Sequence, residues 1–229
     1  MCRRYGLRGE SVVDVGRFLD ELEQEVMQYR VPVVDLIGVQ SRDSYRVLIA
    51  TILSSRTKDE VTAAAADRLF RRAPDCAGLG GLDEAEIREL IFPVGFYKTK
   101  AGHLRRTAQM VLDTYGGVVP DTIEELVKLP GVGRKTANLV LAVAFDKPAI
   151  CVDTHVHRIM NIWGYVKTRT PLETEMALRK KLPQEYWKKV NRILVAFGQG
   201  KCKPVAPHCD ECMLEKACAQ INVVPRKRK

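Results

Sequence analysis

The sequence has no long apolar run. A membrane-spanning helix needs roughly 20 consecutive apolar residues, and no stretch of the 229 residues comes near that length, although 46% of them are apolar. The opening residues MCRRYGLRGESVVD also lack the apolar centre of a secretory signal peptide. These two absences predict a cytoplasmic protein with no membrane partner.

Alternating strand patterns are also scarce. The best candidate is the run from Ala149 to Val152, which is too short and too isolated to seed a sheet. Apolar residues elsewhere recur every three or four positions, as in helices. This spacing is found near residues 15–26, 45–53, 84–91, 98–115 and 184–198, and capping boxes near 57–60, 122–125 and 170–173. The sequence therefore predicts an all-α protein.

Negative charge is in deficit. Lysine and arginine total 37 against 28 for aspartate and glutamate, which leaves a net charge of +9. An excess of cations suits a nucleic acid, because cationic side chains displace the counterions condensed on the phosphate backbone. A membrane surface is the competing partner for a basic protein.

Disulfides are rare in a reducing compartment, so the seven cysteines need another explanation. Three are scattered, at Cys2, Cys76 and Cys151. The other four, separated by six, two and five residues, are Cys202, Cys209, Cys212 and Cys218. Four thiolates suit either tetrahedral zinc or an iron–sulfur cubane. Zinc ribbons usually contain two close pairs, whereas this loop contains one, which favours the cluster.

Residues 129–137 read LPGVGRKTA, which describes a tight turn that leads into a helix. The first turn of a helix presents free N–H groups and a partial positive charge, so it suits a phosphate. Here that turn also carries Arg134 and Lys135, where an ordinary helix favours acidic residues. A glycine turn between two core helices, with solvated basic residues, is the alternative interpretation of these nine residues.

Three elements together resemble the endonuclease III family of DNA glycosylases. They are LPGVGRKTANLVLAVAF from residue 129, CVDTHVHRI from residue 151 and the four spaced cysteines, and the similarity runs from about residue 30 to about residue 220. It implies a helix-hairpin-helix glycosylase fold, with a DNA groove between two helical domains. A six-helix barrel domain would span 37–147, with the hairpin motif at about 122–145, and the second domain would combine 1–36 with 148–229.

The resemblance also implies an activity and a cofactor. The family removes oxidised pyrimidines from double-stranded DNA and cleaves the strand 3′ to the abasic site by β-elimination. A 4Fe-4S cluster would be held by the four cysteines in the loop 202–218. The expected partner is duplex DNA with a damaged base or an abasic site, bound by a monomer that is nucleoid-associated in a prokaryote.

The family's nucleophile falls on Lys135 and its catalytic carboxylate on Asp153. A lysine attacks only as the neutral amine, and both the neighbouring Arg134 and the positive end of a helix favour that form. Asp153 could deprotonate the lysine or stabilise positive charge on the sugar. It also precedes a helical run, so a helix N-cap is its structural alternative.

DNA contacts are implied at further positions. The backbone amides of Gly131, Val132 and Gly133, with Arg134, would hold a phosphate of the damaged strand. In the loops 52–59 and 94–100, Arg56 would contact the orphaned base and Phe96 would wedge into the stack, although relatives often have glutamine and leucine there. Lys203, beside the cysteines, could meet a phosphate.

Three alternatives remain open. A mismatch-specific glycosylase shares the fold, although many such proteins lack the lysine found at position 135. A non-catalytic DNA-binding redox sensor would use the cluster and dispense with Lys135 and Asp153. A zinc-holding DNA-binding module would be colourless. The sequence does not define the lesion range, the preference for the opposite base or the coupling of the two reactions.

Overall fold

The structure, a computed structural model, describes residues 13–26, 33–41 and 43–226. Within these ranges it is built of helices and contains no strand, which confirms the predicted all-α class. The helices are α1 (Val15–Val26), α2 (Val33–Ser41), α3 (Ser44–Ser54), α4 (Asp59–Arg72), α5 (Cys76–Gly81), α6 (Glu84–Ile91), α7 (Tyr97–Tyr115), α8 (Ile123–Leu126), α9 (Arg134–Ala144), α10 (Thr154–Ile162), α11 (Pro171–Lys181) and α12 (Val190–Gly200). Short 3₁₀ turns cover Gln184–Tyr186 and Cys209–Glu211. Cys2 and the last residues of the basic tail lie outside the described residues.

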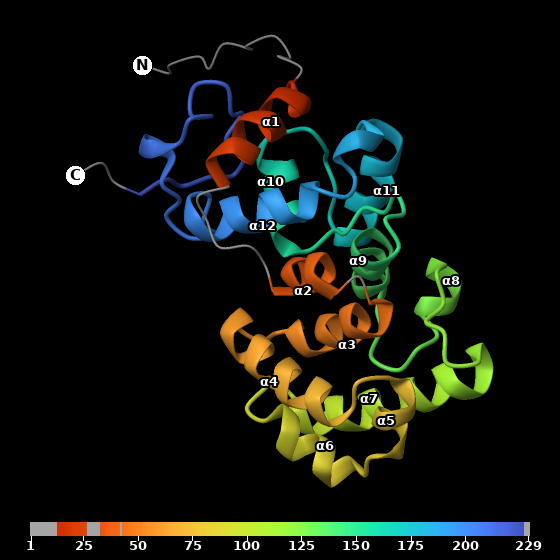
Figure 1. The fold of residues 1–229 in the computed structure, drawn as a ribbon. Coiled ribbons are helices and arrows are strands. Elements are labelled where there is room, and N and C mark those ends of the chain that lie inside the picture. Colours follow the sequence, from red (N-terminus) through yellow and green to blue (C-terminus); the bar gives the residue numbers. More distant parts are fainter. Residues whose placement is uncertain (1–12, 27–32, 42, 227–229) are drawn as a thin grey trace, which may run out of the picture.

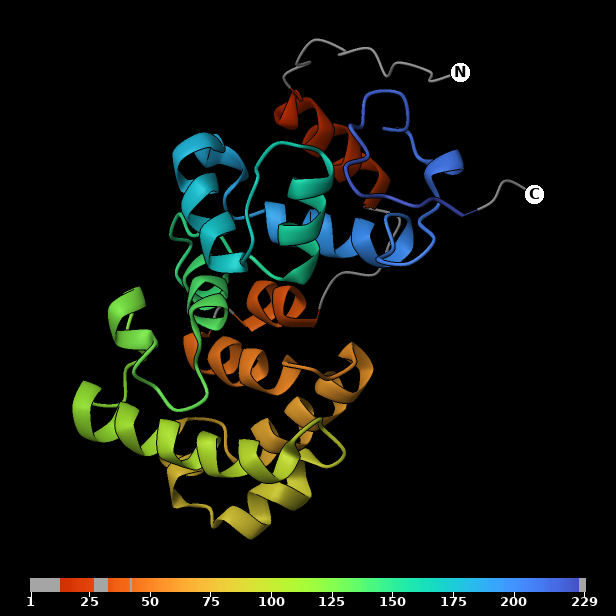
Figure 2. The same ribbon diagram turned by 180° about the vertical axis from the view of Figure 1, so that it is seen from behind.

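The chain packs around two separate hydrophobic cores. One lies among α2 to α9, and the other joins α1 to α10, α11 and α12. Figures 1 and 2 show α1 against α10 and α12 although most of the sequence separates them, with α2 and α9 between the two halves. The first core also includes Val33, Val34 and Ala149, which lie just outside 37–147. Domain boundaries at 37 and 147 remain a prediction.

Two of the three predicted capping boxes provide the N-caps of helices. Thr122 and Thr170 accept hydrogen bonds from the N–H groups of Glu125 and Glu173, as the sequence predicts. The box predicted at Thr57 is wrong: α4 begins at Asp59 without a side-chain cap, and Thr57 Oγ1 instead accepts from Gly95 N at 3.2 Å. That hydroxyl therefore links the loop 52–59 to the loop 94–100.

Other differences from the sequence expectations are small. The stretch 184–198 is divided into a 3₁₀ turn and α12. Ala149 to Val152 are buried and extended, but no strand of the described chain pairs with them. Gly116 ends α7 with a φ of +61°, as expected of a glycine at a helix C-terminus. No helix in the described ranges is long and apolar enough to cross a membrane.

Candidate active site and cysteine loop

Lys135 and Asp153 face each other across the junction of the two halves. Lys135 lies in the first turn of α9, and its Nζ is 3.8 Å from Oδ2 of Asp153. Asp153 caps α10, because its Oδ1 accepts from the N–H groups of His155 and Val156, each at 2.9 Å. The two roles inferred from the sequence are thus compatible: one carboxylate oxygen caps the helix and the other is left to face the lysine.

These two residues line a cleft of about 650 Å³, large enough for a nucleotide-sized ligand. Its walls include Arg56, Lys135, Val152, Asp153, His155 and Asn191. The side chain of Lys135 is 54% exposed and that of Asp153 only 10%. An accessible amine beside a shielded carboxylate is the arrangement that a nucleophile with a supporting base requires.

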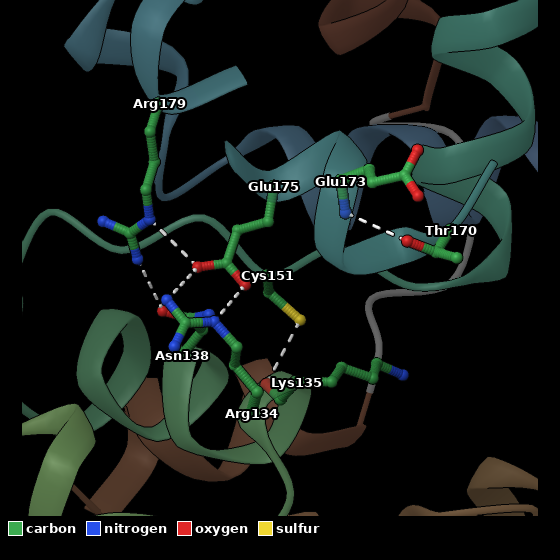
Figure 3. A network of polar contacts seen from close by, with 8 residues as sticks. All are labelled: Arg134, Lys135, Asn138, Cys151, Thr170, Glu173, Glu175 and Arg179. Carbon is green, nitrogen blue, oxygen red and sulfur yellow. Dashed lines mark hydrogen bonds and ion pairs between the residues drawn. The ribbon is translucent and has the colours of Figure 1, made fainter. Parts of the chain in front are cut away.

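Arg134 points away from the cleft. It donates two hydrogen bonds to the buried carboxylate of Glu175 on α11, from Nε at 2.9 Å and from Nη2 at 3.0 Å. Figure 3 shows the side chains of Arg134 and Lys135 leaving α9 in different directions. Arg134 is therefore paired with a carboxylate and is not a bare cation beside Lys135.

Glu175 is the centre of a network that joins the two halves of the molecule. It also accepts from Arg179 Nε at 2.9 Å, and Arg179 Nη2 donates to Asn138 Oδ1 on α9 at 3.0 Å (Figure 3). Glu175 is 3% exposed and Asn138 is fully buried. The network fixes the start of α9, and with it the backbone of Lys135, against α11.

We expect Glu175→Gln to lower the free energy of unfolding by about 1–3 kcal/mol, because two guanidinium groups lose their shared anion in a largely buried place. Urea denaturation followed by circular dichroism measures the change. Asp67→Asn is the matched control, because it breaks an exposed ion pair with Arg71 within α4 and should cost under about 0.5 kcal/mol. Equal losses of unfolding free energy in Glu175→Gln and Asp67→Asn would show that the buried pairs of Glu175 stabilise the fold no more than an exposed ion pair does.

The hairpin before α9 is shaped as the glycine-rich stretch predicts. Gly131 has a φ of +79°, and a Cβ there would lie 2.7 Å from the ring of His103. A Cβ on Gly133 would meet nothing within 4 Å, so the space beside its Cα is open, and no side chain caps α9. Val132 differs, because its N–H already donates to Leu129 O at 3.0 Å. The predicted phosphate contact would therefore depend on the glycines and on the first turn of α9.

Arg56 and Phe96 lie together. The guanidinium carbon of Arg56 is 5.4 Å from the centre of the Phe96 ring, and the ring is 61% exposed. Both have positive φ, +53° and +58°, in the left-handed region that non-glycine residues seldom adopt. With His103 and Gly131 they line a second hollow of about 350 Å³. The structure thus brings the two predicted loops and the hairpin to one face.

Lys100 holds this pair of loops in place. It is only 6% exposed, and its Nζ donates to Leu53 O at 2.8 Å, Ser55 O at 2.6 Å and Thr57 Oγ1 at 3.2 Å. The ammonium group thereby satisfies carbonyl groups at the C-terminus of α3. Burial lowers the pKa of Lys100 to about 8. The ammonium group of Lys100, on α7, therefore holds the loop that carries Arg56 in place by hydrogen bonds.

Titration of Lys100 gives an expected pH dependence of stability. Its pKa is about 8 in the folded chain and about 10.4 when unfolded, so the unfolded chain binds more protons between these values. Stability should therefore rise with pH in this window, by about 2 kcal/mol between pH 7 and pH 10. Urea denaturation of the protein and of Lys100→Met at both pH values isolates the effect.

The control for that titration is Lys128→Met, because Lys128 is an exposed lysine paired with Glu125. The difference in stability between the protein and Lys100→Met should grow with pH, and Lys128→Met shows how much a lysine in a surface ion pair contributes at the same pH values. A constant difference for Lys100→Met would show that burial does not perturb its proton affinity.

The four clustered cysteines surround one hollow beside the second core. Cys202, Cys209, Cys212 and Cys218 line it together with Trp163, Phe197 and Leu214. All four are free thiols, and Arg158 donates to Cys202 O at 2.7 Å, with its other nitrogen 3.8 Å from the Cys202 sulfur. No three acidic, histidine or cysteine side chains of the described chain are placed to hold a single metal ion.

Lys203 lies apart from the cleft. It lines a different hollow with Arg158, Lys167 and Arg169, on the outer side of the cysteine loop. Its proposed contact with a phosphate is therefore independent of the residues around Lys135 and remains a prediction.

Several residues of the site escaped the sequence analysis. Glu175 and Arg179 showed only an ordinary four-residue helical spacing, and Lys100 lay in a quoted loop without any signal of burial. Cys151, treated as a scattered cysteine, has its sulfur 3.7 Å from the backbone O of Lys135 (Figure 3). His155 packs against Gly198, and burial is the largest of the causes that lower its pKa.

Comparison with known sequences gives a consistent result. Residues 49–184 match the family described as HhH-GPD superfamily base excision DNA repair protein. Endonuclease III of Thermotoga maritima is 46% identical, over 87% of this chain and 92% of that protein. Endonuclease III of Bacillus subtilis is 37% identical, over 77% of this chain and 81% of that protein.

Solved structures of DNA glycosylases superpose on this chain. A trapped endonuclease III–DNA covalent intermediate superposes with a TM-score of 0.80 at 33% identity, covering 90% of this chain and 94% of that one. A thermostable thymine-DNA glycosylase superposes with a TM-score of 0.78 at 26% identity, covering 90% of this chain and 95% of that one.

Proposed function

The chain belongs to the endonuclease III family within the HhH-GPD superfamily of base excision DNA repair proteins, and on this basis we infer that it is a bifunctional DNA glycosylase and abasic-site lyase. The observation that carries the inference is the pair formed by Lys135 and Asp153, 3.8 Å apart in a cleft of nucleotide size. Its substrate is duplex DNA with an oxidised pyrimidine or an abasic site.

The duplex is bound by its phosphates and opened at the lesion. The N–H groups at the uncapped start of α9 and at the open Gly133 suit a phosphate, independently of sequence. The damaged nucleotide turns out of the stack into the cleft, where the target atom can be reached. The exposed ring of Phe96 fills the gap, and Arg56 beside it contacts the orphaned base.

The chemical step uses the two facing side chains. Neutral Lys135 Nζ attacks C1′ of the sugar, the bond from C1′ to the base breaks, and the base leaves with the bonding electrons and gains a proton. Asp153 takes the proton lost by the lysine or stabilises the positive charge on the sugar. The C1′–O4′ bond of the sugar then breaks and O4′ gains a proton, which leaves a protonated imine between Lys135 Nζ and C1′. This imine accepts electrons when a C2′ proton is removed, and the C3′–O bond breaks to expel the 3′ phosphate.

The cysteine loop fits a 4Fe-4S cluster. Four free thiols surround one hollow, and Arg158 places positive charge against Cys202, as a cluster with negative charge requires. The single close pair among these cysteines, Cys209 and Cys212, favours this centre over a zinc ribbon, which usually contains two close pairs. When bound, the cluster would cross-link residues 202–218, and the proposed reaction contains no redox step that would need it.

Purified protein with its metal should be brown and absorb broadly in the visible range, whereas a zinc-thiolate protein is colourless. Cys212→Ser should bleach this absorbance and lower the melting temperature, because the loop loses one of its four anchors. Cys76→Ser, which removes a buried thiol of the first core, should leave the absorbance intact. A colourless wild-type protein that contains zinc would refute the cluster.

A mismatch-specific glycosylase is the second candidate, favoured by the superposition on the thymine-DNA glycosylase. The shared fold explains that superposition without implying a shared reaction. A lysine nucleophile leads to strand cleavage, so Lys135 favours the lyase. A mismatch glycosylase would instead release a normal base from a mispair and leave the strand intact.

The experiment that tests the proposal is borohydride trapping. Protein loaded with its metal is incubated with a duplex that contains one thymine glycol, and borohydride is added to reduce any imine to a stable amine. A covalent protein–DNA adduct is expected. Absence of the adduct with this lesion and with a plain abasic site would overturn the lyase assignment.

A further inference from the structure

Asn191 is a buried polar side chain in the wall of the cleft. It lies at the start of α12, is 9% exposed, and lines the same cleft as Lys135 and Asp153. Its amide nitrogen, Nδ2, has no hydrogen-bond partner among the described residues. A buried amide without a partner is destabilising unless another group satisfies it.

The place of Asn191 in the cleft suggests what that group is. The other buried asparagine, Asn138, also has an unpartnered Nδ2, but its Oδ1 accepts from Arg179 within the network around Glu175, and it does not line the cleft. Asn191 instead borders space that a turned-out nucleotide would enter. Asn191 therefore borders the ligand side of the fold, and its Nδ2, itself buried, comes within reach of a base when the side chain turns toward the cleft.

We propose that Asn191 recognises the hydrogen-bonding edge of the turned-out base. The proposal rests on the glycosylase function inferred above, and it assigns base recognition to a residue distinct from the nucleophile and the carboxylate. An asparagine amide offers one donor group and one acceptor side by side. A uracil-type lesion presents the complementary pair, the O4 acceptor and the N3–H donor.

The same side chain can serve a second class of lesion. Rotation of the amide by half a turn exchanges its donor and acceptor, which then match the N4 amino group and the N3 acceptor of a cytosine-type lesion. One residue thus accommodates both types of pyrimidine. An aspartate at this position would only accept, so it would repel O4 of uracil-type bases and, equally, the N3 acceptor of cytosine-type bases.

The test compares Asn191→Asp and Asn191→Ser with the wild-type protein on three duplexes, which carry 5,6-dihydrouracil, 5-hydroxycytosine or a preformed abasic site. For Asn191→Asp, kcat/KM should fall about 10- to 100-fold on both lesions, because the carboxylate meets an acceptor on either base. Asn191→Ser should lose activity on both lesions as well. Cleavage of the abasic duplex should stay within about twofold, because that substrate has no base to recognise.

The abasic duplex also reports that each variant is folded and that its Lys135 works. Losses of equal size on all three substrates, or unchanged rates on both lesions, would overturn the role of Asn191. Failure of the proposed function is distinguishable, because the wild-type protein itself would then leave the abasic duplex uncut. Wild-type cleavage of the abasic duplex, with both variants as active on the two lesions as the wild-type protein, would refute the inference about Asn191 alone.

Discussion

Replacing Lys135 with alanine should abolish the borohydride-trapped adduct and lower the rate of strand cleavage by about 10³- to 10⁵-fold, because no other group in the variant forms the imine. The lysine side chain is 54% exposed, and among the described residues it pairs with Asp153. Its removal should therefore change the free energy of unfolding by less than about 0.5 kcal/mol. Gel analysis of the trapped complex and a single-turnover assay measure the two effects.

Lys180→Ala is the matched control for Lys135→Ala. Lys180 is an exposed lysine on α11 and does not line the cleft. Its variant should give the same yield of adduct as the wild-type protein. An adduct that persists in Lys135→Ala would show that another amine is the nucleophile, and peptide mapping of the reduced complex would then identify it.

Replacing Asp153 with asparagine should separate its two roles. The amide oxygen can still accept from the N–H groups of His155 and Val156, so the cap of α10 is kept. The negative charge that faces Lys135 is lost, and the rate of base removal should fall about 10²- to 10⁴-fold. Single-turnover release of the damaged base measures the effect.

Asp153→Ala loses the cap as well. This variant should be as inactive as Asp153→Asn and also less stable, by about 0.5–2 kcal/mol. Asp83→Ala provides the comparison, because Asp83 caps α6 through Glu86 N and lies in another part of the fold. It should lose stability and keep its activity. Wild-type rates in Asp153→Asn would reduce Asp153 to a helix cap.

The local pattern of the sequence determined much of this protein. The all-α class, the turn into α9, the caps at Thr122 and Thr170 and the end of α7 at Gly116 all follow from residues close in the chain. Such features depend on spacing and on backbone preferences, which neighbouring residues set. The cysteine spacing likewise points to a shared centre, and the structure gathers all four around one hollow.

Contacts between distant parts of the chain could not be inferred in this way. From the sequence, Arg134 is expected to be a free cation beside Lys135. Only the position of α11 shows that Arg134 pairs with Glu175, 41 residues away in the chain. Thr57 looked like a helix cap, but the approach of α7 turns its hydroxyl toward Gly95 and Lys100. When a side chain has two possible hydrogen-bond partners, the tertiary packing decides which of them it contacts. The spacing of neighbouring residues in the sequence does not encode that packing.

The sequence by itself therefore indicated the side chains that we propose to carry the chemistry: Lys135, Asp153 and the four cysteines. The tertiary structure decided what surrounds them. It set the distance from Lys135 to Asp153, brought Arg56 against Phe96, and left Asn191 with an unsatisfied amide in the wall of the cleft. The physical reason is that burial and hydrogen bonding depend on segments that are far apart in the chain and meet only when both cores have formed.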